Sequence, residues 1–178
     1  MALKPTIYKF RVNLADTNQN KFDDFNLTVA LHPSETKERM LARMVAFALN
    51  YTPELAFTKG LSDQEQPDIW QHDDAGVLQT WIEVGEPSVD RLKKAARSGV
   101  KVAVYPFGDS KSQMWFTKNQ GKLAQLDVSI VKLSGEAIQS LEQGLERTND
   151  FSVMCSEDSV YLTLGEVSTE FQLEVLQG

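Results

Sequence analysis

Two carboxylates lie on neighbouring extended segments near the middle of the chain. Asp68 begins one segment, and Glu83, after fourteen intervening residues, lies in the apolar segment 81–84. A short predicted helix that carries Arg91 and Lys94 follows directly. Carboxylates beside cationic side chains can hold a divalent cation next to a scissile phosphodiester. The stretch therefore predicts nuclease-like chemistry, provided that the fold brings these groups together.

Glu38 is a third candidate carboxylate, on a predicted helix over residues 34–50. It is three and seven residues from Leu41 and Val45, so it falls at the edge of the face that should be buried, whereas Glu35 points farther from that face. Glu38 is therefore either part of a carboxylate cluster or a solvent-edge side chain. Two carboxylates about 4 Å apart repel by roughly 4 kcal/mol at an effective dielectric near 20. A cluster thus needs a metal ion, a cationic neighbour or a raised pKa.

The elements that must position these residues follow from hydrophobic periodicity. Segments 6–14 and 25–31 alternate with period two around a polar turn, which predicts an N-terminal hairpin. Its buried face should consist of Tyr8, Phe10, Val12 and Leu14. Ser34 is a suitable N-cap for the helix over 34–50. The apolar stripe of that helix is Leu41, Met44, Val45 and Ala48.

The candidate carboxylates fall among short predicted strands. These strands cover 55–58, 67–71, 77–84 and 100–105. Asp73 and Asp74, followed by Ala75-Gly76, are interpreted as turn formers rather than metal ligands. Pro87 suits the first position of a helix that ends at Ser98-Gly99. A strand, a helix and a strand at this spacing form a βαβ unit, whose strands should be parallel.

The last third of the chain mixes strands with one helix. Strands are predicted over 113–117, 126–133, 151–155, 160–164 and 171–176. A helix over 136–147 has Ser134 as its cap. The whole pattern is a mixed α/β core between N-terminal and C-terminal β segments.

Composition limits the class of protein. A chain of 178 residues with 42% hydrophobic and 24% charged residues is typical of one globular domain. The longest apolar runs are far too short to span a membrane, and the N-terminal residues lack a signal-peptide core, so we expect a cytoplasmic protein without a membrane partner. The single cysteine, Cys155, lies in a strand-like segment and has no Cys–His arrangement, which indicates a structural residue.

The charge of −7 is unevenly distributed. Residues 91–122 contain eight Lys or Arg and one acid, Asp109, a balance of +7 that leaves −14 for the remainder. The basic segment comprises Arg91, Lys93, Lys94, Arg97, Lys101, Lys111, Lys118 and Lys122. Such a segment, directly after two carboxylates, is either a nucleic-acid-binding surface or a solvated face balanced by acidic neighbours.

Pro67-Asp68, a gap, and Glu83 on an apolar strand before a helix resemble the PD-(D/E)xK nuclease superfamily. The resemblance implies a core of one helix, three strands, a helix and a strand around a Mg²⁺ or Mn²⁺ site. Gly85 stands where the superfamily pattern has its lysine. Some members carry this lysine on the following helix, which makes Lys94 the natural replacement, with Arg91 one turn earlier and Lys93 nearer the apolar stripe.

Longer motifs resemble the YaeQ family of bacterial proteins over essentially the whole chain. They are Met1-Ala2-Leu3-Lys4, His32-Pro33-Ser34-Glu35-Thr36-Lys37-Glu38-Arg39-Met40, Phe57-Thr58-Lys59-Gly60-Leu61, and Trp81-Ile82-Glu83-Val84-Gly85 with Arg91 and Lys93-Lys94-Ala95. The resemblance implies a single domain, 1–178, of the α/β class. It would have a PD-(D/E)xK (restriction-endonuclease-like) mixed-sheet core over about 34–133, with helices on both sides. N- and C-terminal β-hairpins over 4–31 and 150–177 would elaborate that core.

The same resemblance implies site residues. Asp68 and Glu83, with Glu38, would bind the metal, Lys94 would act on the phosphate or the attacking water, and Arg91 would contact phosphate or support the site. Three functions follow as hypotheses: a Mg²⁺-dependent nuclease-like phosphodiesterase, a non-catalytic nucleic-acid-binding or transcription-associated protein, and an interaction scaffold. The scaffold hypothesis depends on exposed tryptophans, for which Trp70, Trp81 and Trp115 are the candidates. The oligomeric state stays open.

Overall fold

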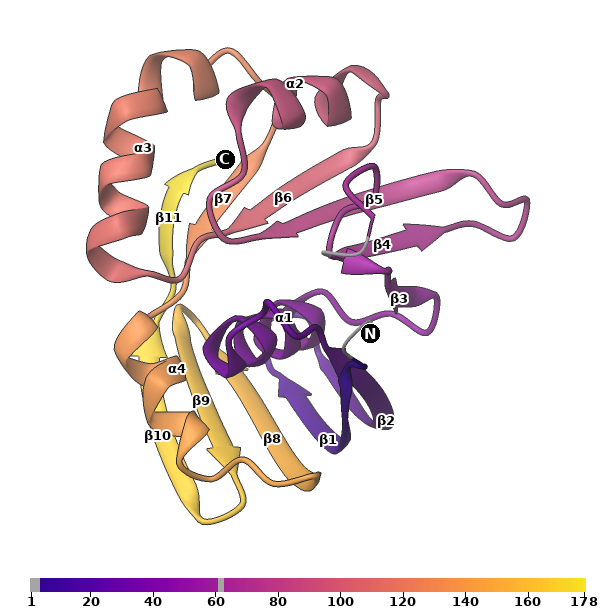
Figure 1. Cartoon of the computed structure of the whole chain (residues 1–178), viewed down its shortest axis with the longest axis vertical. Coiled ribbons are helices and arrows are strands. Elements are labelled where there is room, and N and C mark those ends of the chain that lie inside the picture. Colours follow the sequence, from indigo (N-terminus) through magenta and orange to yellow (C-terminus); the bar gives the residue numbers. More distant parts are fainter. Residues whose placement is uncertain (1–3, 61–62) are drawn as a thin grey trace. The chain divides into compact units, whose positions relative to one another are not determined.

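The computed structural model describes residues 4–60 and 63–178. The Met1-Ala2-Leu3 and Leu61 parts of the motifs quoted above lie outside the described residues. The chain forms two compact units, which are described separately (Figure 1). Unit 1 combines the described residues up to Leu49 with Ser134–Leu173, and unit 2 combines Asn50–Leu133 with Glu174–Gly178.

Unit 1 is built on a five-stranded mixed sheet with the order β10-β9-β8-β1-β2. Its strands are β1 (Thr6–Asp16), β2 (Lys21–Leu31), β8 (Thr148–Ser156), β9 (Ser159–Leu164) and β10 (Val167–Gln172). The predicted N-terminal hairpin is confirmed, because β1 and β2 pair antiparallel along their full length. Strand β8 lies parallel to β1 on the other side. The N-terminal and C-terminal β segments therefore share one sheet.

One face of this sheet is buried as the alternation predicted. Tyr8, Phe10, Val12 and Leu14 all point inward. Helices α1 (Lys37–Leu49) and α4 (Gly135–Glu142) belong to the same unit and pack against each other, α1 against β8 and α4 against β10. The predicted stripe of α1 is buried, but so are its other residues from Met40 to Ala48. This helix is thus a core element of unit 1, without a solvent-facing side in its second half.

Two predictions at the start of α1 are wrong. The helix begins after Thr36, whose hydroxyl accepts from the N–H of Arg39 at 3.1 Å, and Ser34 instead donates its N–H to His32 Nδ1 in the preceding turn. Glu35 points inward rather than away, because Arg43 lies within 2.6 Å of its carboxylate. A buried arginine partner makes burial of that carboxylate possible.

Unit 2 is built on a six-stranded mixed sheet with the order β11-β7-β6-β5-β4-β3. Its strands are β3 (Leu55–Phe57), β4 (Ile69–His72), β5 (Leu78–Val84), β6 (Lys101–Tyr105), β7 (Ser129–Lys132) and β11 (Glu174–Gln177). Strands β5 and β6 are parallel and are joined by α2 (Val89–Arg97), which confirms the βαβ unit. The structure as a whole is a mixed α/β fold, with two mixed sheets and four helices among the described residues.

Helices α2 and α3 (Asp109–Leu123) pack against the same core of unit 2 as β6 and β7. That core is formed by Leu92, Ala95, Val102, Val104, Phe116, Leu123, Val128 and Ile130. The predicted strand over 113–117 is therefore wrong, because this segment is the middle of α3. Ser112, Phe116 and Leu123 recur at helical spacing and are buried, whereas Met114 between them is exposed.

Several predicted boundaries also shift. Ser88 caps α2, because its hydroxyl accepts from Arg91 N–H, so Pro87 precedes the cap instead of opening the helix as predicted. Ser134 caps α4 as predicted, but the helix ends at Glu142. The single strand predicted over 171–176 is two strands, β10 in unit 1 and β11 in unit 2. No helix among the described residues is long and apolar enough to cross a membrane.

Candidate functional site

Unit 2 brings Asp68 and Glu83 together on adjacent strands. Asp68 directly precedes β4, and Glu83 lies near the end of β5, in a ladder that pairs Ile69 with Ile82. Asp68 donates its N–H to the Ile82 carbonyl at 3.1 Å, and its Oδ2 accepts from Val84 N–H at 2.8 Å. Both carboxylates are buried, at 4% and 5% exposure. The two carboxylates therefore lie on adjacent, paired strands, an arrangement that the sequence permitted but could not establish.

Glu83 is held by two donors. Its Oε1 accepts from Arg91 Nε at 2.7 Å and from Trp81 Nε1 at 2.9 Å. Burial raises the pKa of Glu83 above its usual value of 4.5, the Arg91 guanidinium opposes that rise, and the negative charge of Asp68 adds to it. Burial is thus the main cause of the raised pKa of Glu83, and the adjacent Asp68 carboxylate adds a smaller contribution.

Arg91 connects this carboxylate to a loop of the same unit. Besides Glu83, its guanidinium donates to the backbone carbonyls of Gln64 and Gln66. The guanidinium also lies 5.8 Å from the centre of the Trp81 ring. The Ser88 cap starts α2 so that Arg91 falls in its first turn, facing β5. Sequence reasoning missed the two backbone carbonyls, which no side-chain pattern could indicate.

The lysine replacements proposed from the sequence lie elsewhere. Lys94 is exposed and forms an ion pair with Glu65 at 3.0 Å, each side chain having 78% exposure. Lys93 is also exposed. Gly85, at the position of the missing lysine, has a φ of +106°, which side chains other than glycine rarely adopt. The cation that contacts Glu83 is therefore Arg91, and the backbone at Gly85 disfavours any side chain there.

Glu38 lies in unit 1, near the start of α1, and is half-buried. Its neighbour Glu35 makes the buried ion pairs of this region, with Arg39 at 2.7 Å and Arg43 at 2.6 Å. The spacing of four residues between Glu35 and Arg39 is the sequence signal that could have identified this cluster.

The basic segment is mostly solvent-exposed. Arg91 is half-buried, and the other seven lysines and arginines from Lys93 to Lys122 are exposed. On α3, Lys111 and Lys118 border a hollow of about 680 Å³. The hollow is lined by Glu86, Lys111, Gln113, Met114, Trp115, Thr117, Lys118 and Asn119. Trp115 is half-buried there and donates its Nε1–H to the Pro87 carbonyl at 2.9 Å, which fixes its ring.

Other residues considered from the sequence have structural roles. Asp73 accepts from the N–H groups of Ala75 and Val77 at 2.9 Å, which confirms its interpretation as a turn former. Cys155 is buried in β8, and burial raises the pKa of its thiol to about 11, with a smaller contribution from Asp16. Among the described residues, no group of three or more His, Cys, Asp or Glu side chains could hold a metal ion.

The fold and the site define a two-unit α/β protein whose second unit carries a buried carboxylate pair beside an arginine. The chain belongs to the YaeQ family: the family model described as YaeQ protein matches residues 1–173. The YaeQ protein of Salmonella typhi is 36% identical over 178 residues, which cover 99% of this chain and 98% of that protein. The YaeQ protein of Escherichia coli (strain K12) is 36% identical over 179 residues, with the same coverage of 99% and 98%.

Two solved structures of YaeQ proteins have the same fold. The crystal structure of the protein from Xanthomonas axonopodis pv. citri superposes with a TM-score of 0.93 at 27% identity, covering 98% of this chain and 99% of that chain. The structure from Pseudomonas syringae gives a TM-score of 0.91 at 34% identity, covering 98% and 97%.

Proposed function

We propose that this protein is a Mg²⁺-dependent nuclease-like phosphodiesterase that acts on nucleic acid through a PD-(D/E)xK-type site in unit 2. The observation that carries the proposal is the buried pair Asp68–Glu83 on adjacent strands, with Arg91 at the edge of the pair. The succession of α1, β3, β4, β5, α2 and β6 resembles the core of that superfamily. Buried acids with a perturbed pKa are more frequent at functional sites than elsewhere.

The donor set suits a hard divalent cation. Mg²⁺ is commonly bound by one or two carboxylates together with water and substrate oxygens, so a pair of carboxylates is a sufficient protein contribution. Asp68 raises the pKa of Glu83, which means that the two negative charges destabilise each other. A cation bound by both would relieve that repulsion. A bound Mg²⁺ or Mn²⁺ supplies an activated water and stabilises the charge on the phosphoryl group.

The surrounding residues would orient the carboxylates and the substrate. Val84 N–H fixes one oxygen of Asp68, while Trp81 and Arg91 fix Oε1 of Glu83. Arg91 presents a planar set of donors that matches phosphate geometry. Lys94 would contact a phosphate once its ion pair with Glu65 opens, and an exposed ion pair of this kind opens at little energetic cost.

The test measures metal binding and cleavage separately. Isothermal titration calorimetry with Mn²⁺ should show one site that Asp68→Asn and Glu83→Gln abolish, and Mg²⁺-dependent cleavage of labelled DNA or RNA should be lost in the same variants. Glu54→Gln, an exposed carboxylate of the same unit, is the matched control and should retain both. Glu38→Gln tests the third carboxylate. Cleavage that persists unchanged in Glu83→Gln would disprove the catalytic role of this pair.

A second function, nucleic-acid binding without turnover, is favoured by Gly85 and by the hollow on α3. A positive φ at Gly85 disfavours a lysine at the superfamily position. The hollow combines an aromatic ring with exposed lysines, which is the usual composition of a single-strand binding surface. Under this alternative, an oligonucleotide should bind with a steep dependence on salt, and Lys118→Ala should lower the slope by about 1. Binding of the oligonucleotide without cleavage in Mg²⁺ or Mn²⁺ would support this second function over the first.

A further inference from the structure

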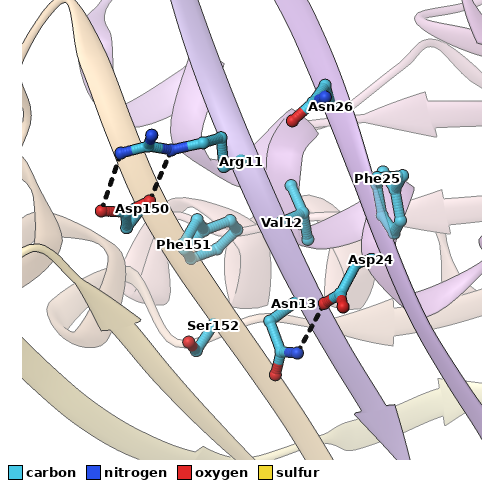
Figure 2. A pocket seen from close by; sticks show the side chains of 9 residues that line it. All are labelled: Arg11, Val12, Asn13, Asp24, Phe25, Asn26, Asp150, Phe151 and Ser152. Carbon is cyan, nitrogen blue, oxygen red and sulfur yellow. Dashed lines mark hydrogen bonds and ion pairs between the residues drawn. The ribbon is translucent and has the colours of Figure 1, made fainter.

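The solvent face of the five-stranded sheet in unit 1 is organised in rows that run across the strands. Figure 2 shows β8, β1 and β2 side by side, with Arg11 on β1 bonded to Asp150 on β8 and Asn13 bonded to Asp24 on β2. A hollow of about 440 Å³ lies over these rows. The Arg11 row also contains Asn26, which pairs with Arg11 across the β1–β2 ladder. The centre of the face is therefore polar and already ordered.

An apolar row crosses four strands of the same face. Ala15 pairs with Phe22 on β2 and with Met154 on β8, and Met154 pairs in turn with Tyr161 on β9. Phe22 is 63% exposed, Met154 42% and Tyr161 38%. A continuous strip of exposed apolar side chains on a sheet indicates an interaction surface more strongly than scattered ones do.

A second, smaller apolar pair lies at the opposite end of the face. Ile7 pairs with Ala30, and Ile7 is 40% exposed. Arg11 lies four residues after Ile7 and four residues before Ala15, and Asn26 lies midway between Phe22 and Ala30. The two apolar groups are thus equally spaced on either side of the Arg11 row.

Charged residues also lie on both sides of the Arg11 row, and their signs are opposite on the two sides. Lys9 lies between the Ile7 pair and the Arg11 row. Asp24 lies between the Arg11 row and the Phe22 row, and Glu170 pairs with Tyr161 at the far end of that row. One end of the face is therefore basic, and the other is acidic.

We propose that this sheet face binds the same face of a second copy of the chain, around a twofold axis that runs across the strands at the Arg11 row. Such an axis reverses the strand direction, so it places the Ile7–Ala30 pair of one copy over the Ala15–Phe22 pair of the other. It also brings Lys9 of each copy near Asp24 of its partner copy. Apolar groups then meet apolar groups at both ends of β1 and β2, and Lys9 meets Asp24. On the axis itself, the Arg11–Asp150 ion pair of one copy meets that of the other, and each pair is neutral as a whole. This is the self-complementarity that an isologous interface requires.

The size of the face fits a weak to moderate dimer. Strands β1 and β2 each have 11 residues, which corresponds to about 35 Å along the strands, and five strands span about 20 Å. The shorter β9 and β10 reduce the face to roughly 600 Å², near the lower end of stable interfaces, which bury about 600–1,000 Å² per partner. Aligned packing of two sheet faces is a common arrangement.

Sedimentation velocity over a series of protein concentrations tests the dimer. The wild type should associate reversibly, and Phe22→Asp should raise the dissociation constant by about tenfold or more, because it introduces a charge into the apolar contact. Lys9→Asp should weaken the dimer through repulsion from Asp24, and the swap Lys9→Asp with Asp24→Lys should restore most of the affinity. Restoration by the swap is specific to this twofold arrangement.

Met114→Asp is the matched control, since Met114 is an apolar side chain of unit 2 with 72% exposure. Its dissociation constant should equal that of the wild type. Thermal unfolding confirms that each variant folds, and Met154→Gln replaces Phe22→Asp if the latter does not. A wild type that stays monomeric throughout, or a dimer that neither Phe22→Asp nor Met154→Gln weakens, overturns the proposal. Neither result bears on metal binding by Asp68 and Glu83.

Discussion

Each unit contains a buried glutamate that meets an arginine eight residues later in the chain, but the two pairs differ in their surroundings. In unit 1, Arg43 contacts both carboxylate oxygens of Glu35, at 2.6 and 2.9 Å, and Arg39 adds a third contact at 2.7 Å. In unit 2, Glu83 contacts one guanidinium group, through Arg91 Nε, and has the Asp68 carboxylate as its neighbour.

The difference separates a structural ion pair from a candidate functional one. Two guanidinium groups around Glu35 overcompensate its charge and tie α1 to β2, because Arg43 also donates to the Ala30 carbonyl at 3.1 Å. Glu83 instead has one guanidinium group and a second carboxylate, that of Asp68, beside it. Burial of a glutamate beside an arginine is therefore insufficient evidence for function. What distinguishes the site is the neighbouring Asp68 carboxylate, which adds to the rise that burial causes in the pKa of Glu83.

The largest expected effect comes from breaking the pair in unit 1. Arg43→Ala leaves the buried Glu35 carboxylate without its bidentate partner and should lower the free energy of unfolding by about 3–5 kcal/mol. Urea denaturation measures the change. The double variant Glu35→Leu with Arg43→Met replaces both charges by apolar groups and should recover most of the loss. A small effect of Arg43→Ala would mean that the pair contributes little to the fold.

A smaller, pH-dependent effect is expected at Glu83. Its pKa is raised in the folded protein above the usual 4.5, so the folded state holds the proton more tightly than the unfolded state. Ionisation of Glu83 therefore lowers the free energy of unfolding as the pH rises from about 4.5 through the folded pKa. Glu83→Gln cannot ionise, so its stability relative to the wild type should increase over that interval. Denaturation at a series of pH values, with Glu54→Gln as control, measures this trend, and a constant difference would contradict it.

The smallest effect on stability is expected for Lys94. Its ion pair with Glu65 is exposed on both sides, so Lys94→Ala should change the free energy of unfolding by less than about 0.5 kcal/mol. Any loss of nucleic-acid binding or cleavage in this variant can then be assigned to the lysine itself. A large loss of stability would show instead that Lys94 holds the loop at Glu65 in place.

Many strands of both units were predictable because their signals are local. Period-two alternation identified the inward face of β1, and turn residues separated β4 from β5. The strand predicted over 113–117 is wrong. The three consecutive apolar residues Met114-Trp115-Phe116 are compatible with a strand, but the buried positions Ser112, Phe116 and Leu123 have helical spacing. Glu35 was placed wrongly because its inward direction depends on Arg43, two helical turns farther along the chain.

The candidate site was predictable only in part. Strands β4 and β5 followed from the pattern, but their pairing, which places Asp68 beside Glu83, is seen only in the structure. The identity of the cation beside Glu83 could not be predicted. The Ser88 cap sets the rotation of α2, and that rotation places Arg91 rather than Lys94 at Glu83. The positive φ of Gly85 is a backbone property that the residue type permits but does not require.

The order of segments along the chain has a consequence for synthesis on the ribosome. Strand β11 completes an edge of the sheet in unit 2, yet it follows all of unit 1 in the sequence. The β1–β2 hairpin, made first, likewise waits for β8, its parallel neighbour from the last third of the chain. The sheet of unit 1 needs strands that are synthesised after residues 50–133 of unit 2, and the sheet of unit 2 needs a strand that is synthesised after all of unit 1. We therefore expect slow folding dominated by distant pairings, with β1 and β7 exposing unpaired edges in the nascent chain.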